Sequence, residues 1–392
     1  MRGHIVKRGK DSYSVVISLG TDPATGKRRQ QWVTTKGTKR DAERRLGEVL
    51  HQLDTGAFMR PGKISVADYL KKWLTDYAKP NLAPRSVEGY QTIISQHLIP
   101  RLGAILLTQL KPEHIQNYYA GCLTSGRCDA SGGLNPLTVR HHHMVLHKAL
   151  QTAVEWGLII RNPADGVKPP RGQPKEMTTL TEDDMRIFLE AAKKTPYYAL
   201  FYTALFTGMR RSEILALRWC DTDLLLCQIS VTRTLHHLKD GSYVYRQPKS
   251  AKGRRSIALS PSTAVVFREH REKIEAERLF LGLPALQESD LVFAHYDGSP
   301  LRPNTVTRAW SNLAKKCGVK ASRFHDARHS HASLMLKQGV HPKVVQERLG
   351  HATIAVTLDT YSHVAPGLQE LAAQRFDDAF KVSHNTNVES VR

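Results

Sequence analysis

Six side chains in the C-terminal half of the chain have the chemistry needed to break and rejoin a phosphodiester: a phenol nucleophile, guanidiniums, imidazoles and an amine. They are Arg210, Lys249, His325, Arg328, His351 and Tyr361. Taken singly, each has an ordinary explanation, such as a surface charge, a helix cap or a packing residue. Their order in the chain and their local sequence context are more informative than any one of them.

The predicted ends of helices place several of these residues at accessible positions. Arg210 follows Gly208, which ends a very apolar helix, so we expect its guanidinium to point out of the core with its donors free. His351 follows a second helix-ending glycine. His325 and Arg328 open another helix and share one face, because they are three residues apart.

Lys249 lies in the turn between two predicted strands, directly after a proline. Lys252 lies on the same loop and is the alternative amine. The register favours Lys249, because it ends the preceding strand.

This ordered set resembles the tyrosine recombinase family of phage-type integrases. The resemblance covers nearly the whole chain and rests on four motifs: Thr207-Gly208-Met209-Arg210-x-x-Glu213, His325-x-x-Arg328-His329, Leu349-Gly350-His351 and Thr360-Tyr361-Ser362-His363. It implies a site-specific DNA recombinase with an arm-binding N-terminal module, a helical core-binding domain and a catalytic domain. It also implies a covalent 3′-phosphotyrosine intermediate and action as a homotetramer on DNA.

Transesterification by such a set needs a nucleophile and two proton transfers. Tyr361 is the nucleophile, and since the pKa of tyrosine is ordinarily about 10, its phenol needs help at neutral pH. His325 is the best candidate to accept the phenol proton. Lys249 would protonate the leaving 5′ oxygen. Because the phosphodiester energy is kept in the covalent link, we expect no ATP requirement.

The remaining three residues would bind the phosphate itself. Arg210 and Arg328 can each bind non-bridging oxygens bidentately and stabilise the pentavalent transition state. His351 would donate a hydrogen bond to the same group. We therefore expect no metal cofactor, and the sequence shows no convincing site for one.

The spacing between His351 and Tyr361 limits the local structure. In one straight helix these residues would be about 15 Å apart, at a rise of about 1.5 Å per residue, which is too far for both to contact one phosphate. We therefore expect Thr353 to begin a separate helix, or a mobile segment to deliver Tyr361.

Residues 176–392 are predicted to form the catalytic domain, mainly α-helical with a small antiparallel sheet. Three short strand-like runs predict an antiparallel meander. These runs are 226–234, 243–247 and 256–259.

The segment after Tyr361 also has a helical pattern. Residues 367–381 place apolar side chains on one face. The resemblance implies that this C-terminal helix docks on a neighbouring protomer, and packing on its own catalytic domain is the alternative.

Residues 64–164 are predicted to form an all-α core-binding (SAM-like) domain. The following linker, 165–175, is rich in Gly and Pro and is basic, so Lys168 and Arg171 are candidate DNA contacts. A histidine cluster at 141–143 lacks the glutamate of a helical zinc motif. We interpret these histidines as residues of a DNA-facing helix or of the surface.

Residues 1–60 are predicted to form a small α+β domain, a three-stranded sheet plus a helix that begins near Thr38. They contain 13 Lys and Arg against 6 Asp and Glu, a net charge of about +7. The resemblance makes this segment the arm-type DNA-binding domain, with Lys27, Arg28 and Arg29 as phosphate contacts. A solvated basic face is the alternative.

The composition of the 392 residues agrees with a nucleic-acid partner. Lys and Arg number 57 against 36 Asp and Glu, a formal net charge of +21, which favours a polyanion, most simply DNA or RNA. A hydrophobic fraction of 41% excludes a wholly disordered chain. Five scattered cysteines predict neither a disulfide framework nor a metal site. We find no membrane-spanning run and no apolar signal segment, and expect a cytoplasmic, bacterial, nucleoid-associated protein.

These observations favour a recombinase that integrates and excises a mobile element at core and arm attachment sites on double-stranded DNA, with a directionality factor as a further partner. A type IB topoisomerase, which uses the same transesterification, is the enzymatic alternative. A non-catalytic DNA-binding regulator is the alternative from another class, and the complete set of six residues argues against it.

Overall fold

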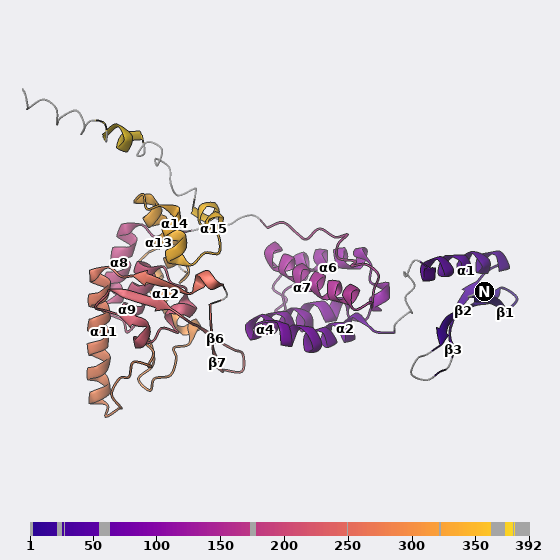
Figure 1. Ribbon diagram of the computed structural model, residues 1–392, viewed down its shortest axis with the longest axis horizontal. Coiled ribbons are helices and arrows are strands. Elements are labelled where there is room, and N and C mark those ends of the chain that lie inside the picture. The colour runs from indigo at the N-terminus through magenta and orange to yellow at the C-terminus, as the bar shows by residue number, and fades with distance from the viewer. Residues whose placement is uncertain are drawn as a thin grey trace, which may run out of the picture. The chain divides into compact units, whose positions relative to one another are not determined.

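The structure is a computed structural model that describes residues 3–21, 26, 28–54, 63–172, 178–248, 250–320, 323–361, 373–378 and 380. The chain divides into two compact units, Met1–Pro174 and Lys175–Arg392. Figure 1 shows their helices and strands, and each unit is described by itself.

The N-terminal part of the first unit is a three-stranded antiparallel sheet covered by one helix. The strands pair in the order β1-β2-β3. Their bounds are β1 Gly3–Gly9, β2 Ser12–Thr21 and β3 Arg28–Lys36, and the helix is α1 Lys39–Asp54. The helix begins directly after Thr38, as expected, and Asp41 accepts a hydrogen bond from the Thr38 backbone N at 2.9 Å, which caps α1. Val15, Ile17 and Val49 are buried between the sheet and α1, so the predicted three-stranded sheet plus helix is confirmed.

The rest of the first unit is helical. Its elements are α2 Val66–Trp73, η1 Leu74–Ala78, α3 Lys79–Asn81, α4 Pro84–Ile93, η2 Ile94–Leu98, α5 Ile99–Leu102, η3 Leu107–Gln109, α6 Pro112–Ser125 and α7 Pro136–Glu155. Ser65 caps α2 by accepting from the Asp68 backbone N at 3.1 Å. Tyr69 and Trp73 on α2 are fully buried and pack in one core with Leu146 and Leu150 of α7.

The structure corrects our interpretation of the histidine cluster on α7 at one position, His142. His142 is 1% exposed, and its Nδ1 lies 2.8 Å from the Tyr118 hydroxyl on α6. His143 Nδ1 lies 2.6 Å from the Tyr119 hydroxyl. Position 142 belongs to the face of α7 that packs on α6, so this histidine is not a surface residue, whereas His141 is exposed. Burial lowers the pKa of His142 to about 4.

The second unit is mainly helical (Figure 1), and its described strands form two small antiparallel sheets. Its helices are α8 Glu182–Ala192, α9 Tyr198–Thr207, α10 Arg211–Ile214, η4 Trp219–Asp221, η5 Ala251–Gly253, α11 Pro261–Phe280, α12 Pro303–Lys316, α13 Asp326–Lys337, α14 Pro342–Leu349 and α15 Ile354–Tyr361. Its strands are β4 Thr222–Asp223, β5 Gln228–Val231, β6 Thr234–His237, β7 Tyr243–Arg246 and β8 Arg255–Ala258.

The predicted meander is wrong, because these strands form two sheets. One has the order β4-β5-β8, and the other pairs β6 with β7. The break falls at two residues between β5 and β6: Thr232 Oγ1 donates to Asp221 at 3.0 Å, and Arg233 Nε donates to the Ala216 carbonyl at 2.8 Å. These bonds draw the chain out of the first sheet, so β6 and β7 form a separate hairpin.

Helix α9 packs within the hydrophobic core of the second unit. Phe201 of α9 packs edge-on against Trp310 of α12 at 5.2 Å between ring centroids, and Phe188 of α8 lies 4.3 Å from the same indole. All three side chains are almost completely buried. This packing fixes the position of the C-terminal end of α9, where the candidate site begins.

Candidate active site

The C-terminal ends of α9 and α14 meet at the candidate site, and each of these helices is followed by a glycine in the left-handed conformation. Gly208 caps α9 at φ +64°, and Gly350 caps α14 at φ +66°. A Cβ atom at Gly208 would lie 2.6 Å from Leu349 Cδ2 and 2.8 Å from His331 Cδ2, so a side chain there would be both strained and crowded. The backbone carbonyls at the C-terminal ends of α9 and α14 therefore lie close together.

Arg328 binds both of these helix ends. The residue is 3% exposed on α13, with Nη1 donating to the Gly208 carbonyl at 2.8 Å and Nη2 to the Leu349 carbonyl at 2.7 Å. Carbonyls at helix C-termini attract cations because their partial negative charge is unopposed within the helix. Both of these acceptors are neutral, so neither cancels the charge of the guanidinium.

Arg210 reaches the same turn from α10. Its Nη2 donates to the Gly350 carbonyl at 3.2 Å, and its Nη1 pairs with Glu213 Oε1 at 2.7 Å. The expectation that its donors would be free is wrong, because Glu213 lies three residues further along α10 and caps the helix by accepting from the Arg210 backbone N at 2.9 Å. The Arg210 side chain nevertheless remains 37% exposed.

A buried carboxylate connects Arg210 to a second arginine. The Glu213 side chain is 0% exposed, and its Oε2 accepts from Arg255 Nη2 at 2.9 Å. Burial opposes ionisation, but the hydrogen bond and charge of Arg255, together with Arg210, keep the pKa of the Glu213 carboxyl below its ordinary value. The carboxylate is therefore ionised at neutral pH.

His351 follows Gly350 and is buried in the same place. Its Nδ1 lies 2.8 Å from Thr357 Oγ1 of α15, and its carbonyl accepts from Gln346 Nε2 at 2.9 Å. Burial, followed by the positive charges of Arg328 and Arg210, lowers the pKa of the His351 imidazole to about 4. The ring is therefore neutral at neutral pH.

His325 stands at the N-cap of α13, one turn before Arg328. His325 is exposed, and its ring packs edge-on against His329, with centroids 4.8 Å apart. Desolvation, His329 and the charges of Arg328 and Arg210 lower the pKa of His325 to about 4. The imidazole is therefore neutral at neutral pH and has a ring nitrogen that can accept a proton, and burial and the two guanidiniums make it a weaker base than an ordinary histidine.

The structure thus brings Arg210, His325, Arg328 and His351 together around the turn at 349–350, from three segments of the chain, because His325 and Arg328 share the start of α13. Lys249 and the side chain of Tyr361 lie outside the described residues. Lys252, the alternative amine, donates its Nζ to the Ala352 carbonyl at 2.9 Å. As the spacing required, α15 is a separate helix that begins at Ile354, after the left-handed turn at Gly350.

The predicted DNA contacts are described only in part. Lys168 and Arg171 are exposed. Lys27 lies outside the described residues, and Arg28 and Arg29 are described only as backbone of β3.

The sequence reasoning missed two residues of this site. Arg255 belongs to a basic run, Lys252-Gly253-Arg254-Arg255, which looks like surface charge. Thr357 showed no signal beyond its place four residues before Tyr361. The role of Arg255 depends on contacts with distant segments, and that of Thr357 depends on a contact with His351, across the turn before α15.

The part of the chain that the structure describes contains neither a cluster of metal ligands nor a membrane-spanning helix. No group of three or more His, Cys, Asp or Glu side chains there could hold a metal ion. Within the same residues, no helix is both long enough and apolar enough to cross a bilayer.

The chain is similar to known proteins over nearly its whole length. The model of the phage integrase family matches residues 178–367, and the model of the phage integrase N-terminal SAM-like domain matches residues 65–122. An integrase of Streptomyces ambofaciens is 30% identical over 378 residues, covering 95% of this chain and 94% of the relative. The ICEBs1 integrase of Bacillus subtilis is 26% identical, covering 95% and 99%, and a XerC-like tyrosine recombinase of Caldanaerobacter subterraneus is 26% identical, covering 96% and 98%.

Solved structures share the fold. The Tn1549 transposon integrase in complex with a circular intermediate DNA has a TM-score of 0.67 at 20% identity, covering 80% of this chain and 99% of that one. A lambda integrase tetramer bound to a Holliday junction has a TM-score of 0.54 at 17% identity, covering 92% and 94%. Together with the relatives, these matches show that the chain belongs to the phage integrase family, the tyrosine recombinases.

Proposed function

We propose that this site-specific recombinase integrates and excises its mobile element by transferring a DNA phosphodiester to Tyr361 and then to a second strand. The observation that carries the proposal is that Arg210 and Arg328 contact the consecutive carbonyls of Gly350 and Leu349, directly before a neutral His351. One phosphate placed at this turn would meet two guanidiniums and an imidazole. This is the electrostatic arrangement that stabilises a pentavalent phosphorane.

In the cleavage step, the Tyr361 phenol oxygen forms a bond to phosphorus while the bond to the 5′ oxygen breaks. The phenol proton passes to His325, whose lowered pKa leaves it neutral and able to accept. Lys249 gives a proton to the leaving 5′ hydroxyl. Attack by a 5′ hydroxyl of the partner duplex reverses these steps, so neither hydrolysis nor ATP is needed.

The position of α15 supports Tyr361 as the nucleophile. His351 Nδ1 and Thr357 Oγ1 are 2.8 Å apart, which ties α15 to the phosphate-binding turn. Position 361 lies four residues beyond 357, on the same face of the helix. We infer that this face of α15 is turned toward the bound phosphate.

We propose four parts for DNA binding: an arm-type domain at 1–60, a core-binding domain at 64–164, a linker at 165–175 and the catalytic domain at 176–392. The SAM-like match supports the second, and the exposed Lys168 and Arg171 support contacts from the linker. The Tn1549 relative bound to DNA supports double-stranded DNA as the partner. We place the reaction in the bacterial cytoplasm, on the nucleoid, with a directionality factor for excision.

We also propose that four protomers act together and exchange C-terminal helices. The lambda tetramer on a Holliday junction supports the tetramer. Phe376 and Phe380 are 67% and 63% exposed, and their rings lie 4.9 Å apart. The segment 362–372 that joins them to α15 lies outside the described residues. A chain truncated after Pro366 is expected to bind one site but to lose recombination, and equal recombination by the truncated and full chains would refute the exchange.

The central test is adduct formation on a nicked suicide substrate that carries a core site. Tyr361→Phe is expected to bind the site with near-unchanged affinity and to form no covalent adduct, because only the phenol oxygen is lost. An adduct trapped by this variant would assign the nucleophile to another residue. Strand transfer between two duplexes separates the recombinase from a type IB topoisomerase, which only relaxes DNA. The adduct itself separates either enzyme from a non-catalytic regulator.

A further inference from the structure

A second arginine, Arg255, shares the carboxylate partner of Arg210. Arg255 begins β8, its side chain is 6% exposed, and it grips Glu213 with two donors: Nη2 to Oε2 at 2.9 Å and Nη1 to Oε1 at 3.2 Å. The same carboxylate accepts from Arg210 Nη1 at 2.7 Å. One buried carboxylate therefore joins a buried guanidinium to one that is 37% exposed.

Arg255 also contacts the turn that leads to His351. Its Nε donates to the Arg348 carbonyl at 2.6 Å, near the end of α14. A Cβ atom at Gly350 would lie 3.0 Å from Arg255 Nη1 and 3.1 Å from its Cδ, so the side chain packs directly on this glycine. Because Arg210 donates to the Gly350 carbonyl from another direction, Arg255 connects α10 with the phosphate-binding turn.

Arg255 also changes the net charge of this cluster. Glu213 and Arg210 alone would form a neutral pair, in which the guanidinium is drawn toward the carboxylate. With Arg255 on the same carboxylate, the three groups keep one net positive charge next to the turn. In a poorly solvated site, that difference strongly affects the attraction of a phosphate.

We infer that Arg255 is a positioning residue for DNA cleavage, which shares the Glu213 carboxylate and packs on Gly350 so that Arg210 and the turn before His351 face one phosphate with a net positive charge. The inference rests on the transesterification proposed above. It predicts that loss of Arg255 slows the chemical step while leaving the binding of the DNA duplex nearly unchanged.

The test measures single-turnover adduct formation on the nicked core substrate at saturating protein. Arg255→Met is expected to cleave about 100-fold more slowly, the effect of a small misplacement or of one lost transition-state donor. The dissociation constant for the core site is measured in parallel and is expected to change by less than about threefold, well under the tenfold that 1.4 kcal/mol would produce.

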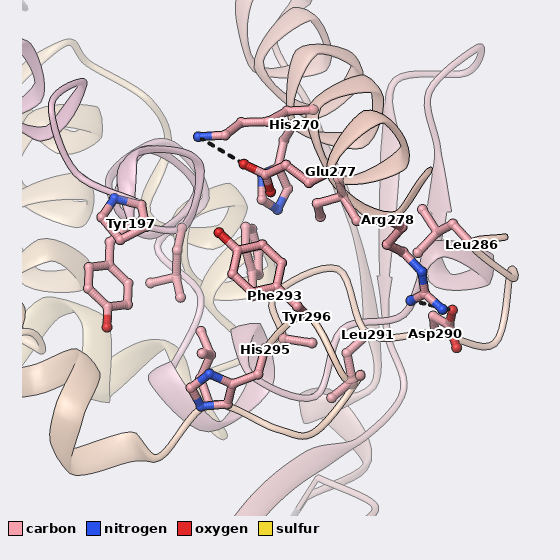
Figure 2. A pocket seen from close by; sticks show the side chains of 17 residues that line it. Tyr197, His270, Glu277, Arg278, Leu286, Asp290, Leu291, Phe293, His295 and Tyr296 are labelled. Carbon is pink, nitrogen blue, oxygen red and sulfur yellow. Dashed lines mark hydrogen bonds and ion pairs between the residues drawn. The ribbon is translucent and has the colours of Figure 1, made fainter. Parts of the chain in front are cut away.

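Arg278→Met is the matched control. Like Arg255, Arg278 is mostly buried, at 14% exposure, with Nη1 3.3 Å from Asp290 and Nε donating to the Pro284 carbonyl at 2.8 Å. Figure 2 shows this pair beside a cavity of about 270 Å³ that is lined by none of the six predicted catalytic residues. The control should lower thermal stability to a similar extent and cleave at the wild-type rate.

A substrate with an uncharged methylphosphonate at the scissile position separates positioning of charge from mere support of the fold. With no negative charge on the phosphate, Arg255→Met is expected to lose less than about tenfold, against about 100-fold on the ordinary substrate. A purely structural role would give equal losses on both substrates.

If Arg255→Met does not fold, the double variant Arg255→Met, Glu213→Gln carries the test. It leaves no unpaired buried carboxylate and restores one net positive charge through Arg210. It is expected to cleave the ordinary substrate within about tenfold of wild type, and a loss as large as 100-fold would overturn the inference.

The outcomes also separate this inference from the proposed function. A wild-type chain that forms no adduct refutes the transesterification. A wild-type chain that cleaves, together with an Arg255→Met variant that cleaves equally fast or loses equally on both substrates, refutes the role of Arg255 alone.

Discussion

Replacing Thr357 with valine tests how α15 is attached to the site. Thr357 is fully buried, and its Oγ1 lies 2.8 Å from His351 Nδ1. Position 361 follows one turn later on the same helical face. Valine keeps nearly the same shape but can neither donate nor accept, so the change removes this bond and little else.

The size of the effect follows from the burial of both partners. A net hydrogen bond of this kind contributes about 1 kcal/mol, and an imidazole nitrogen that loses this hydroxyl inside the protein costs about 1–3 kcal/mol. If this free energy stabilises the position of α15 in the transition state, its loss slows adduct formation by roughly 5- to 150-fold, since each 1.4 kcal/mol is a factor of ten in rate.

The assay is single-turnover adduct formation on the nicked core substrate, with DNA affinity measured on the same preparations. Thr357→Ser is the matched control, because it keeps the hydroxyl and removes only a methyl group. We expect the serine variant to cleave at close to the wild-type rate, and both variants to bind the core site normally.

Two results would refute the reasoning. Cleavage by Thr357→Val at the wild-type rate would show that the bond to His351 does not position the helix. An equal loss in Thr357→Ser would assign the effect to side-chain volume and not to the hydroxyl.

Three further predictions concern charge, domains and pH. Adduct formation should persist in excess EDTA, since Arg210 and Arg328 supply the positive charge that a metal would otherwise supply; loss on chelation with recovery on adding Mg²⁺ or Zn²⁺ would contradict this. A fragment from Lys63 onward should cleave core DNA but lose arm-site binding, and arm-site affinity equal to that of the full chain would count against a separate arm-binding domain. The pKa of His351 is about 4 in the folded chain and ordinarily about 6.5 when unfolded. The unfolded state therefore binds more protons between these values, and stability should fall as pH drops from about 6.5 toward 4, by up to about 3 kcal/mol from this group. Denaturant unfolding measures the free energy of unfolding of wild type and of His351→Gln at both pH values. If the difference in stability between the two proteins is the same at both pH values, the prediction is refuted.

Local signals in the sequence were sufficient for the ends of the elements that build the site. Gly208 and Gly350 end α9 and α14 in the left-handed region that other residues avoid. Such features depend on a few neighbouring residues, so a single sequence contains the necessary information.

Features that depend on distant partners could not be predicted in this way. The pairing of β5 with β8 skips the β6–β7 hairpin, because side chains between β5 and β6 bond to other segments. The burial of His142 depends on Tyr118 of a different helix. The part played by Arg255 depends on Glu213 and on Gly350, which lie on opposite sides of it in the sequence.

The way the arginines are held explains how a buried site can remain attractive to a phosphate. Arg328 is fixed by two backbone carbonyls, at 2.8 and 2.7 Å, which orient the guanidinium without cancelling its charge. Carboxylates in those two positions would have given the same geometry and a neutral or negative site. Glu213 supplies a full negative charge beside Arg210, and Arg255 and Arg210 share it. The convergence of two helix C-termini at Gly208 and Leu349 is therefore part of the chemistry, because helix ends provide strong neutral acceptors that leave the positive charge for DNA.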